Sequence, residues 1–96
     1  MTEYSASAKV LLTHEVGLHA RPSVKLTKLA KSFASDISIA AADDGPWIDA
    51  KSIVKVMALK VPKDSVLFLR AGGDDADEAV SALVGLVERD FDAGSE

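Results

Sequence analysis

The sequence predicts a single α+β domain in which helices cover one face of a four-stranded, largely antiparallel sheet. Three observations support this fold class. The chain has 96 residues, of which 48% are apolar, and this is enough for one core but not for two. Apolar residues alternate along short segments, as in strands, and recur every three or four positions along two longer segments, as in helices. The predicted order is β-α-β-β-α-β-α, with the other sheet face polar and wet.

The first half of the chain is predicted to form a strand, a helix and a second strand. Residues 4–12 alternate between apolar and polar side chains, as a half-buried strand does. Over residues 20–34 a single apolar stripe predicts a helix. Pro22 falls in the first turn of this helix, where a missing N–H costs nothing, while Val24 lies off the stripe. Alternation resumes over residues 37–41 and predicts the second strand.

A hairpin and a short helix are predicted next. The Asp-Asp-Gly run at residues 43–45 is a strong hairpin turn, and residues 46–49 follow it as a short strand. Ser52 is a good N-cap for a helix over residues 53–59. Because this helix is apolar nearly all round, some of its apolar side chains should stay exposed. Such a patch usually marks the binding site of a partner.

The last part of the chain is predicted to form a strand and a long helix. Residues 66–71 alternate again, and two glycines then turn the chain. Asp75 stands three residues before Glu78, which resembles a capping box with Asp as the cap of a helix over residues 76–90. The whole chain therefore forms one domain over residues 1–96, and residues 92–96 are expected to fray.

Composition excludes several classes of function. The formal net charge is −4, which argues against nucleic-acid binding as the main role. No apolar run approaches the roughly 20 residues that span a bilayer, and the N-terminal residues do not resemble a signal peptide. Without cysteine there is no thiolate metal site and no disulfide. We therefore expect a cytoplasmic protein with no membrane segment, metal or cofactor.

The segment most informative for chemistry has the sequence GLHARP and spans residues 17–22. It places His19 directly before the predicted helix start, where the first N–H groups have no intrahelical partner and carry a partial positive charge. These N–H groups would hold a phosphoryl group on His19, and Arg21 would add a charge-assisted hydrogen bond. The same field disfavours a protonated imidazole and so keeps the ring nucleophilic. From the residues alone, a solvent-facing histidine near a helix cap remains the alternative.

The GLHARP segment resembles the active-site signature of the HPr family, the histidine-containing phosphocarriers of the bacterial phosphotransferase system. Residues 51–57, Lys-Ser-Ile-Val-Lys-Val-Met, resemble the regulatory-serine motif of the same family, and the resemblance extends over roughly residues 6–91. It implies the open-faced β-sandwich of the family, with three helices on one face of the sheet. It also implies that His19 is phosphorylated on Nδ1, that Arg21 assists transfer and that Ser52 is a regulatory phosphorylation site.

The resemblance implies partners as well. A docking patch for partner proteins would comprise four apolar residues: Val24, Ile53, Val54 and Met57. The expected partners are enzyme I as phosphoenolpyruvate-dependent donor, IIA-type proteins as acceptors and a serine kinase/phosphatase acting on Ser52. The chain is expected to act as a monomer and as a stoichiometric carrier instead of an enzyme.

Two alternatives remain open at this point. Val16 and Lys55 depart from the usual family pattern and look more like the nitrogen-branch relative than a sugar-transport carrier. In that reading the chain is a regulatory binding module, gated by phosphorylation of His19 or Ser52. Ser52 can also be a plain N-cap without any regulatory role.

Overall fold

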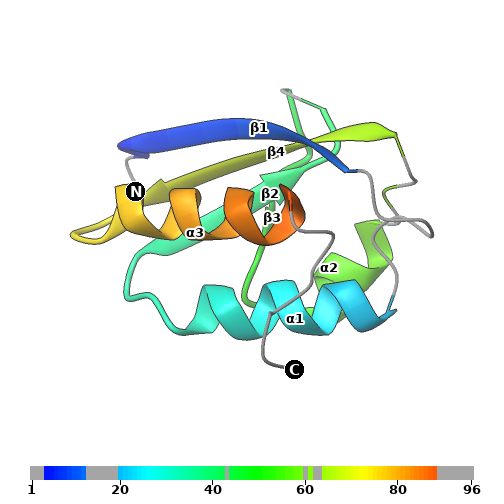
Figure 1. Ribbon diagram of the computed structural model, residues 1–96, viewed down its shortest axis with the longest axis horizontal. Helices are drawn as coiled ribbons and strands as arrows, with labels where there is room; N and C mark the ends of the chain where they lie inside the picture. The colour runs from blue at the N-terminus through cyan, green and yellow to red at the C-terminus, as the bar shows by residue number, and fades with distance from the viewer. Residues whose placement is uncertain (1–3, 13–19, 43, 60, 62–63, 89–96) are drawn as a thin grey trace.

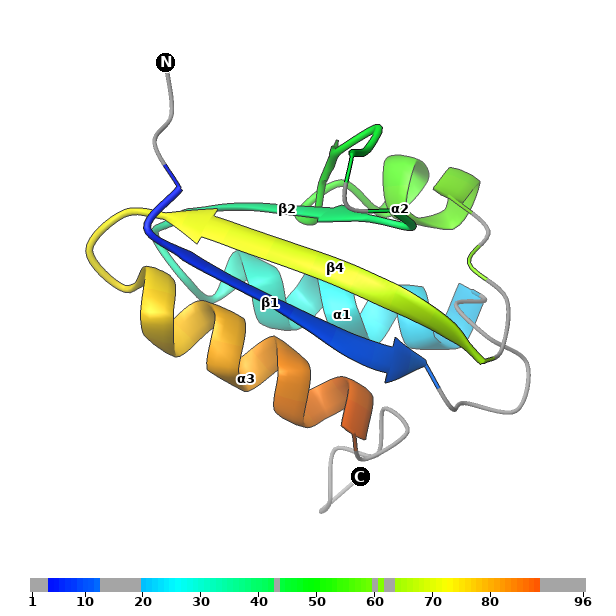
Figure 2. The ribbon, with the colours of Figure 1, turned by 90° about the horizontal axis from the view of Figure 1, so that it is seen from above.

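The computed structural model describes residues 4–12, 20–42, 44–59, 61 and 64–88 (Figure 1). It confirms the predicted α+β class and the order of elements. Helices α1 and α3 lie side by side against one face of the sheet, and α2 packs beside α1 (Figures 1 and 2). The elements are β1 (Ala6–Leu12), α1 (Ala20–Lys31), β2 (Asp36–Ala40), β3 (Ile48–Asp49), α2 (Ile53–Leu59), β4 (Ser65–Gly72) and α3 (Ala76–Glu88).

The four strands form one antiparallel sheet in the order β1-β4-β2-β3. Strand β4 lies between β1 and β2, so that its Leu67 pairs with Val10 on β1 and its Leu69 pairs with Ile39 on β2. Alternate residues of these strands point toward the helices and form the core with one stripe from each helix. The largest fully buried side chains of this core include Leu12, Leu26, Ile37, Ile39, Val56, Leu67, Leu69, Leu83 and Val87.

Helix α1 and strand β3 are shorter than the sequence predicts. Helix α1 ends at Lys31 because the amide of Ser32 donates to the carbonyl of Leu29 at 3.0 Å, which tightens the last turn. The Ser32 hydroxyl donates to the same carbonyl at 2.6 Å. Strand β3 pairs with β2 only at Ile48–Asp49. The turn before it is confirmed, since the Gly45 amide donates to Ala42 and Gly45 has a φ of 87°.

The side chain of Asp75 does not form the predicted capping box with its own helix. Its carboxylate accepts hydrogen bonds from the amides of Ala34 and Ser35, each at 2.9 Å, and from the Ser35 hydroxyl. Asp75 therefore ties the start of α3 to the turn between α1 and β2. The two turns approach so closely that a Cβ at Gly73, whose φ is 143°, would lie 2.6 Å from Ser35 Oγ.

This tie predicts a loss of stability in acid. The pKa of Asp75 is lowered from its ordinary value of 3.8, first by the hydrogen bond from the Ser35 hydroxyl and then by that from the Ala34 amide. A lowered pKa in the folded state stabilises the fold above 3.8, and this contribution disappears as the pH falls through the lowered value. Thermal melts from about pH 5 to about pH 2 should show Asp75→Asn less stable than wild type at the upper end, with the difference shrinking toward the lower end.

Asp74 provides a matched control for this prediction, because it is an exposed acid in the same turn. Asp74→Asn should keep the acid dependence of the wild type. If Asp75→Asn also shows the acid dependence of the wild type, protonation of other carboxylates causes the loss of stability in acid.

The sheet face that the helices leave open is less polar than predicted. On it Leu11 is 50% exposed, and it is paired with Val66 on β4. The guanidinium of Arg70 stacks between two rings, 4.1 Å from the centroid of Tyr4 and 4.0 Å from that of Trp47. This cation–π stack joins the segment before β1, strand β4 and the turn before β3.

Among the described residues, no helix is long and apolar enough to cross a membrane.

Candidate functional site

The predicted phosphoryl-accepting residue, His19, lies just outside the described residues, as does the rest of residues 13–19. Helix α1 begins at the next residue, Ala20, so that His19 directly precedes the helix in the sequence. The first turn of α1 has backbone N–H groups without intrahelical partners, and Pro22 contributes none. That turn contains no acidic residue, while Lys28 and Lys31 occupy the last turn. The positive end of the α1 dipole is therefore not neutralised by acids of its own helix.

The first turn of α1 is anchored on one side and open on another. Within it, Pro22 and Ser23 are fully buried. The next residue, Val24, is 51% exposed, as expected for a residue off the apolar stripe. The side chain of Arg21 is not among those the structure describes, so its contribution to the site stays a prediction. What the fold supplies at this point is a helix start directly after His19 in which Pro22 and Ser23 are buried.

Ser52 caps helix α2. Its hydroxyl accepts a hydrogen bond from the amide of Lys55 at 3.4 Å, and its carbonyl accepts one from the amide of Val56 at 2.9 Å. Ser52 is partly exposed, and a phosphate on its hydroxyl would lie at the start of α2. The N-cap prediction is thus confirmed, whereas the regulatory role stays a prediction.

A contact that sequence analysis missed fixes the start of α2. The ammonium of Lys51 donates to the carbonyl of Phe33 at 2.8 Å, and its amide donates to the Asp49 carboxylate at 2.9 Å. Lys51 thereby joins the segment before Ser52 to the residues that follow α1. No local signal could have revealed the contact with Phe33, because the two residues lie 18 positions apart.

The four residues of the predicted docking patch lie on two adjacent helices. Val24 is on α1, and Ile53, Val54 and Met57 are on α2, which packs beside α1 (Figures 1 and 2). Val54 is 74% exposed and Met57 is 43% exposed, while Ile53 is partly buried. Val56 is the fully buried residue that anchors α2 to the core. The structure therefore leaves three apolar side chains of this patch open to solvent, and their binding role stays a prediction.

Comparison with known proteins agrees with these features. The family described as "PTS HPr component phosphorylation site" matches residues 6–89. The phosphocarrier protein HPr of Cupriavidus necator is 40% identical over 83 residues, which cover 86% of this chain and 91% of that protein. A multiphosphoryl transfer protein of Salmonella typhimurium is 37% identical over 84 residues, covering 86% of this chain and 22% of that protein.

A solved structure extends the agreement to the fold. The crystal structure of HPr-C-His from Thermoanaerobacter tengcongensis has a TM-score of 0.82 and 37% sequence identity, and it covers 90% of this chain and 94% of that one. The helix start after His19, the capped α2 and the open-faced sheet thus occur in a chain whose sequence and fold both match the same family. This chain therefore belongs to the HPr family of phosphocarrier proteins of the phosphotransferase system.

Proposed function

We propose that this phosphocarrier accepts a phosphoryl group on His19 from a phosphoenolpyruvate-dependent enzyme I and passes it to a IIA-type acceptor protein. The observation that carries this proposal is the position of His19 directly before the first turn of α1, whose N–H groups have no intrahelical partner and which contains no acid. Such a helix start favours a dianionic group beside it by both hydrogen bonding and charge.

The transfer requires no metal or cofactor on this chain. A lone pair of the His19 imidazole attacks phosphorus, a new N–P bond forms, and the N–P bond of the donor phosphohistidine breaks, returning its electron pair to the donor ring. The family resemblance assigns the attacking atom as Nδ1. The resulting phosphohistidine passes its phosphoryl group onward by the same kind of step. The acceptor histidine then attacks phosphorus, and His19 is the leaving group. The chain is therefore a carrier that is restored in each cycle.

The partners would dock on the apolar patch of Val24, Ile53, Val54 and Met57 on α1 and α2, all of which are exposed except Ile53, which is partly buried. Its position beside the start of α1 suits a surface that must bring a donor or acceptor histidine toward His19. The absence of cysteine fits a cytoplasmic location, and the chain would act there as a monomer between its two partners.

The proposal is tested by incubating the chain with enzyme I and labelled phosphoenolpyruvate, and then adding candidate IIA proteins. The label should first appear on this chain and then move to the acceptor. A chain that binds enzyme I without taking up label would contradict the carrier function. It would favour the second candidate, a binding module whose docking is gated by phosphorylation.

Arg21 should act on the transfer step more than on docking. Its guanidinium would contact the charge that shifts while the phosphoryl group moves, so Arg21→Ala should lower kcat more than it raises KM. Arg21→Lys should recover only part of the rate, because an ammonium lacks the bidentate fork. Steady-state kinetics of transfer from enzyme I measure both effects.

Lys28→Ala serves as the matched control, since Lys28 is an exposed basic residue further along the same helix. It should leave kcat near the wild-type value. A pure increase in KM for Arg21→Ala would mean that Arg21 only docks the partner.

Ser52 is the proposed site of regulation. It lies at the N-terminus of α2 and immediately precedes the exposed apolar residues of that helix. A phosphate there would add charge next to the docking patch without entering the core. A serine kinase/phosphatase is the partner that this role would require.

A further inference from the structure

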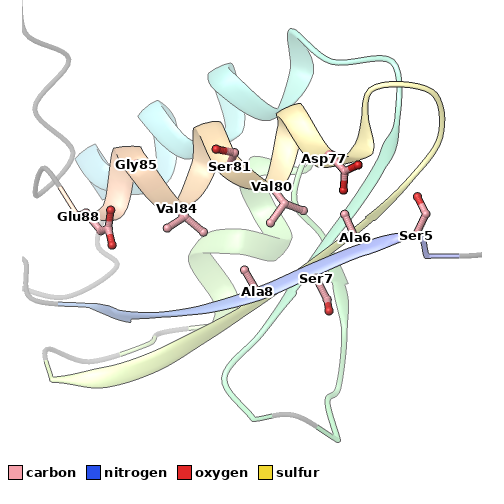
Figure 3. Close-up of a pocket in the computed structure, with 10 residues that line it drawn as sticks. All are labelled: Ser5, Ala6, Ser7, Ala8, Asp77, Val80, Ser81, Val84, Gly85 and Glu88. Carbon is pink, nitrogen blue, oxygen red and sulfur yellow. The ribbon is translucent and has the colours of Figure 1, made fainter.

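A groove lies between the first half of β1 and helix α3 (Figure 3). Its volume is about 690 Å³. Residues 5–8 form one wall, and one side of α3, from Asp77 to Glu88, forms the other. Ala6 and Ala8 point toward Val80 and Val84 across it (Figure 3). We call it the β1–α3 groove.

The β1 wall of this groove is an edge of the sheet. Among the described strands, β1 pairs only with β4, so its other edge has no strand partner. An edge strand exposes backbone N–H and C=O groups that can pair with another chain. Strand β1 contains no proline to block such pairing. Small residues line the space beside it, namely Ala6 and Ala8 on β1 and Ser81 and Gly85 on α3.

The groove is acidic at both ends. Asp77 lies in the first turn of α3 and Glu88 is its last residue, and both side chains are exposed. Among the described residues that line the groove there is no lysine or arginine. An occupant that complements this charge must carry basic side chains.

A second copy of this chain does not meet that requirement. Its own edge strand offers a single basic residue, Lys9, and each copy has a net charge of −4. Pairing two copies would bring acidic grooves together, which opposes association.

We propose that the β1–α3 groove binds an extended, basic segment of a partner protein, which adds to the sheet as a strand beside β1. The backbone of the segment would pair with the free edge, and its small or apolar side chains would face Val80 and Val84. Two basic side chains would meet Asp77 and Glu88. At ~1.5 Å per helical residue these two acids lie ~16 Å apart along α3, which a strand spans in about five residues. The two basic side chains must therefore be about four or six positions apart, because only an even separation places both on the same face of a strand.

This binding site is separate from the phosphoryl-transfer site. Residues 5–8 belong to the end of β1 far from the start of α1, as both views of the ribbon show (Figures 1 and 2). The inference therefore does not rest on the proposed function, and a variant of the groove should leave phosphoryl transfer unchanged.

The test uses a synthetic peptide of alternating threonine and valine that carries two lysines about four or six positions apart, so that both lysines lie on the same face of the strand. Titrated into the isotopically labelled full chain, it should shift the amide resonances of residues 5–8 and of the exposed side of α3. Asp77→Asn combined with Glu88→Gln should weaken binding about threefold to tenfold, since exposed ion pairs are individually weak. Glu88→Gln alone, at the end of α3 far from its N-terminal cap, gives a second variant if the double variant melts early.

Two controls make the result decisive. Glu78→Gln removes an exposed acid of α3 that does not line the groove, so it should bind the peptide as wild type does. A peptide with alternate amides N-methylated should not bind, because it cannot pair with the edge of β1. Equal binding by a peptide with glutamate in place of lysine, shifts confined to other surfaces, or no binding would each overturn the proposal. Concentration-dependent self-association through the same residues would show that the occupant is a second copy.

Discussion

Replacing His19 with alanine should abolish phosphoenolpyruvate-dependent labelling of the chain and leave its cooperative thermal melting intact. The loss should be complete because the only other histidine of the sequence, His14, does not directly precede α1. The fold should survive because the core is built from α1, α2, α3 and the sheet, and His19 precedes the first residue of α1. Labelling with enzyme I and a melting curve on the same sample measure both expectations.

His14→Ala is the matched control, since His14 is the other histidine of the chain. It should take up label at the wild-type rate. If instead His19→Ala retains the label and His14→Ala loses it, the phosphoryl group is carried on His14. Loss of cooperative melting in His19→Ala would assign His19 a structural role.

The second large effect is expected from Ser52→Asp, which should slow transfer from enzyme I while leaving the melting temperature near that of wild type. A negative charge at the N-terminus of α2 is favourable for the helix dipole, so the fold tolerates it. The same charge lies next to Val54, which is 74% exposed, and a docking partner would have to desolvate it. A phosphate, with about −1.5 to −2 charges, should slow transfer further.

Ser52→Ala separates the cap from the regulatory role. It removes the hydrogen bond from the Lys55 amide and should cost about 1 kcal/mol of stability. Transfer from enzyme I should stay near normal, because no charge is added to the docking patch. If Ser52→Asp transfers as fast as wild type, Ser52 only caps α2 and has no regulatory role in this chain.

Much of the candidate site could be predicted from sequence because its parts are local. A histidine before a helix start and a serine before an apolar helix are both visible within a few residues, and α1 and α2 begin at Ala20 and Ile53 as expected. The exposure of Val54 and Met57 also follows from a short helix that is apolar nearly all round. The contact between Lys51 and Phe33 could not be predicted, because it joins two elements that only the folded chain brings together.

The class of fold and the place of each element along the chain follow from the sequence alone. Alternation and helical stripes reflect which side of a single element is buried, and caps act over three or four residues. Which distant groups meet, in contrast, depends on how the elements pack in the folded domain. The tertiary structure assigned the Asp75 carboxylate to the turn at Ala34 and Ser35 instead of to its own helix, and it placed Arg70 between two aromatic rings. It also left the edge of β1 open beside an acidic side of α3. These contacts depend on the strand order and on the packing of the helices. Both are set by the free energy of the whole domain, so no local sequence pattern reveals the contacts.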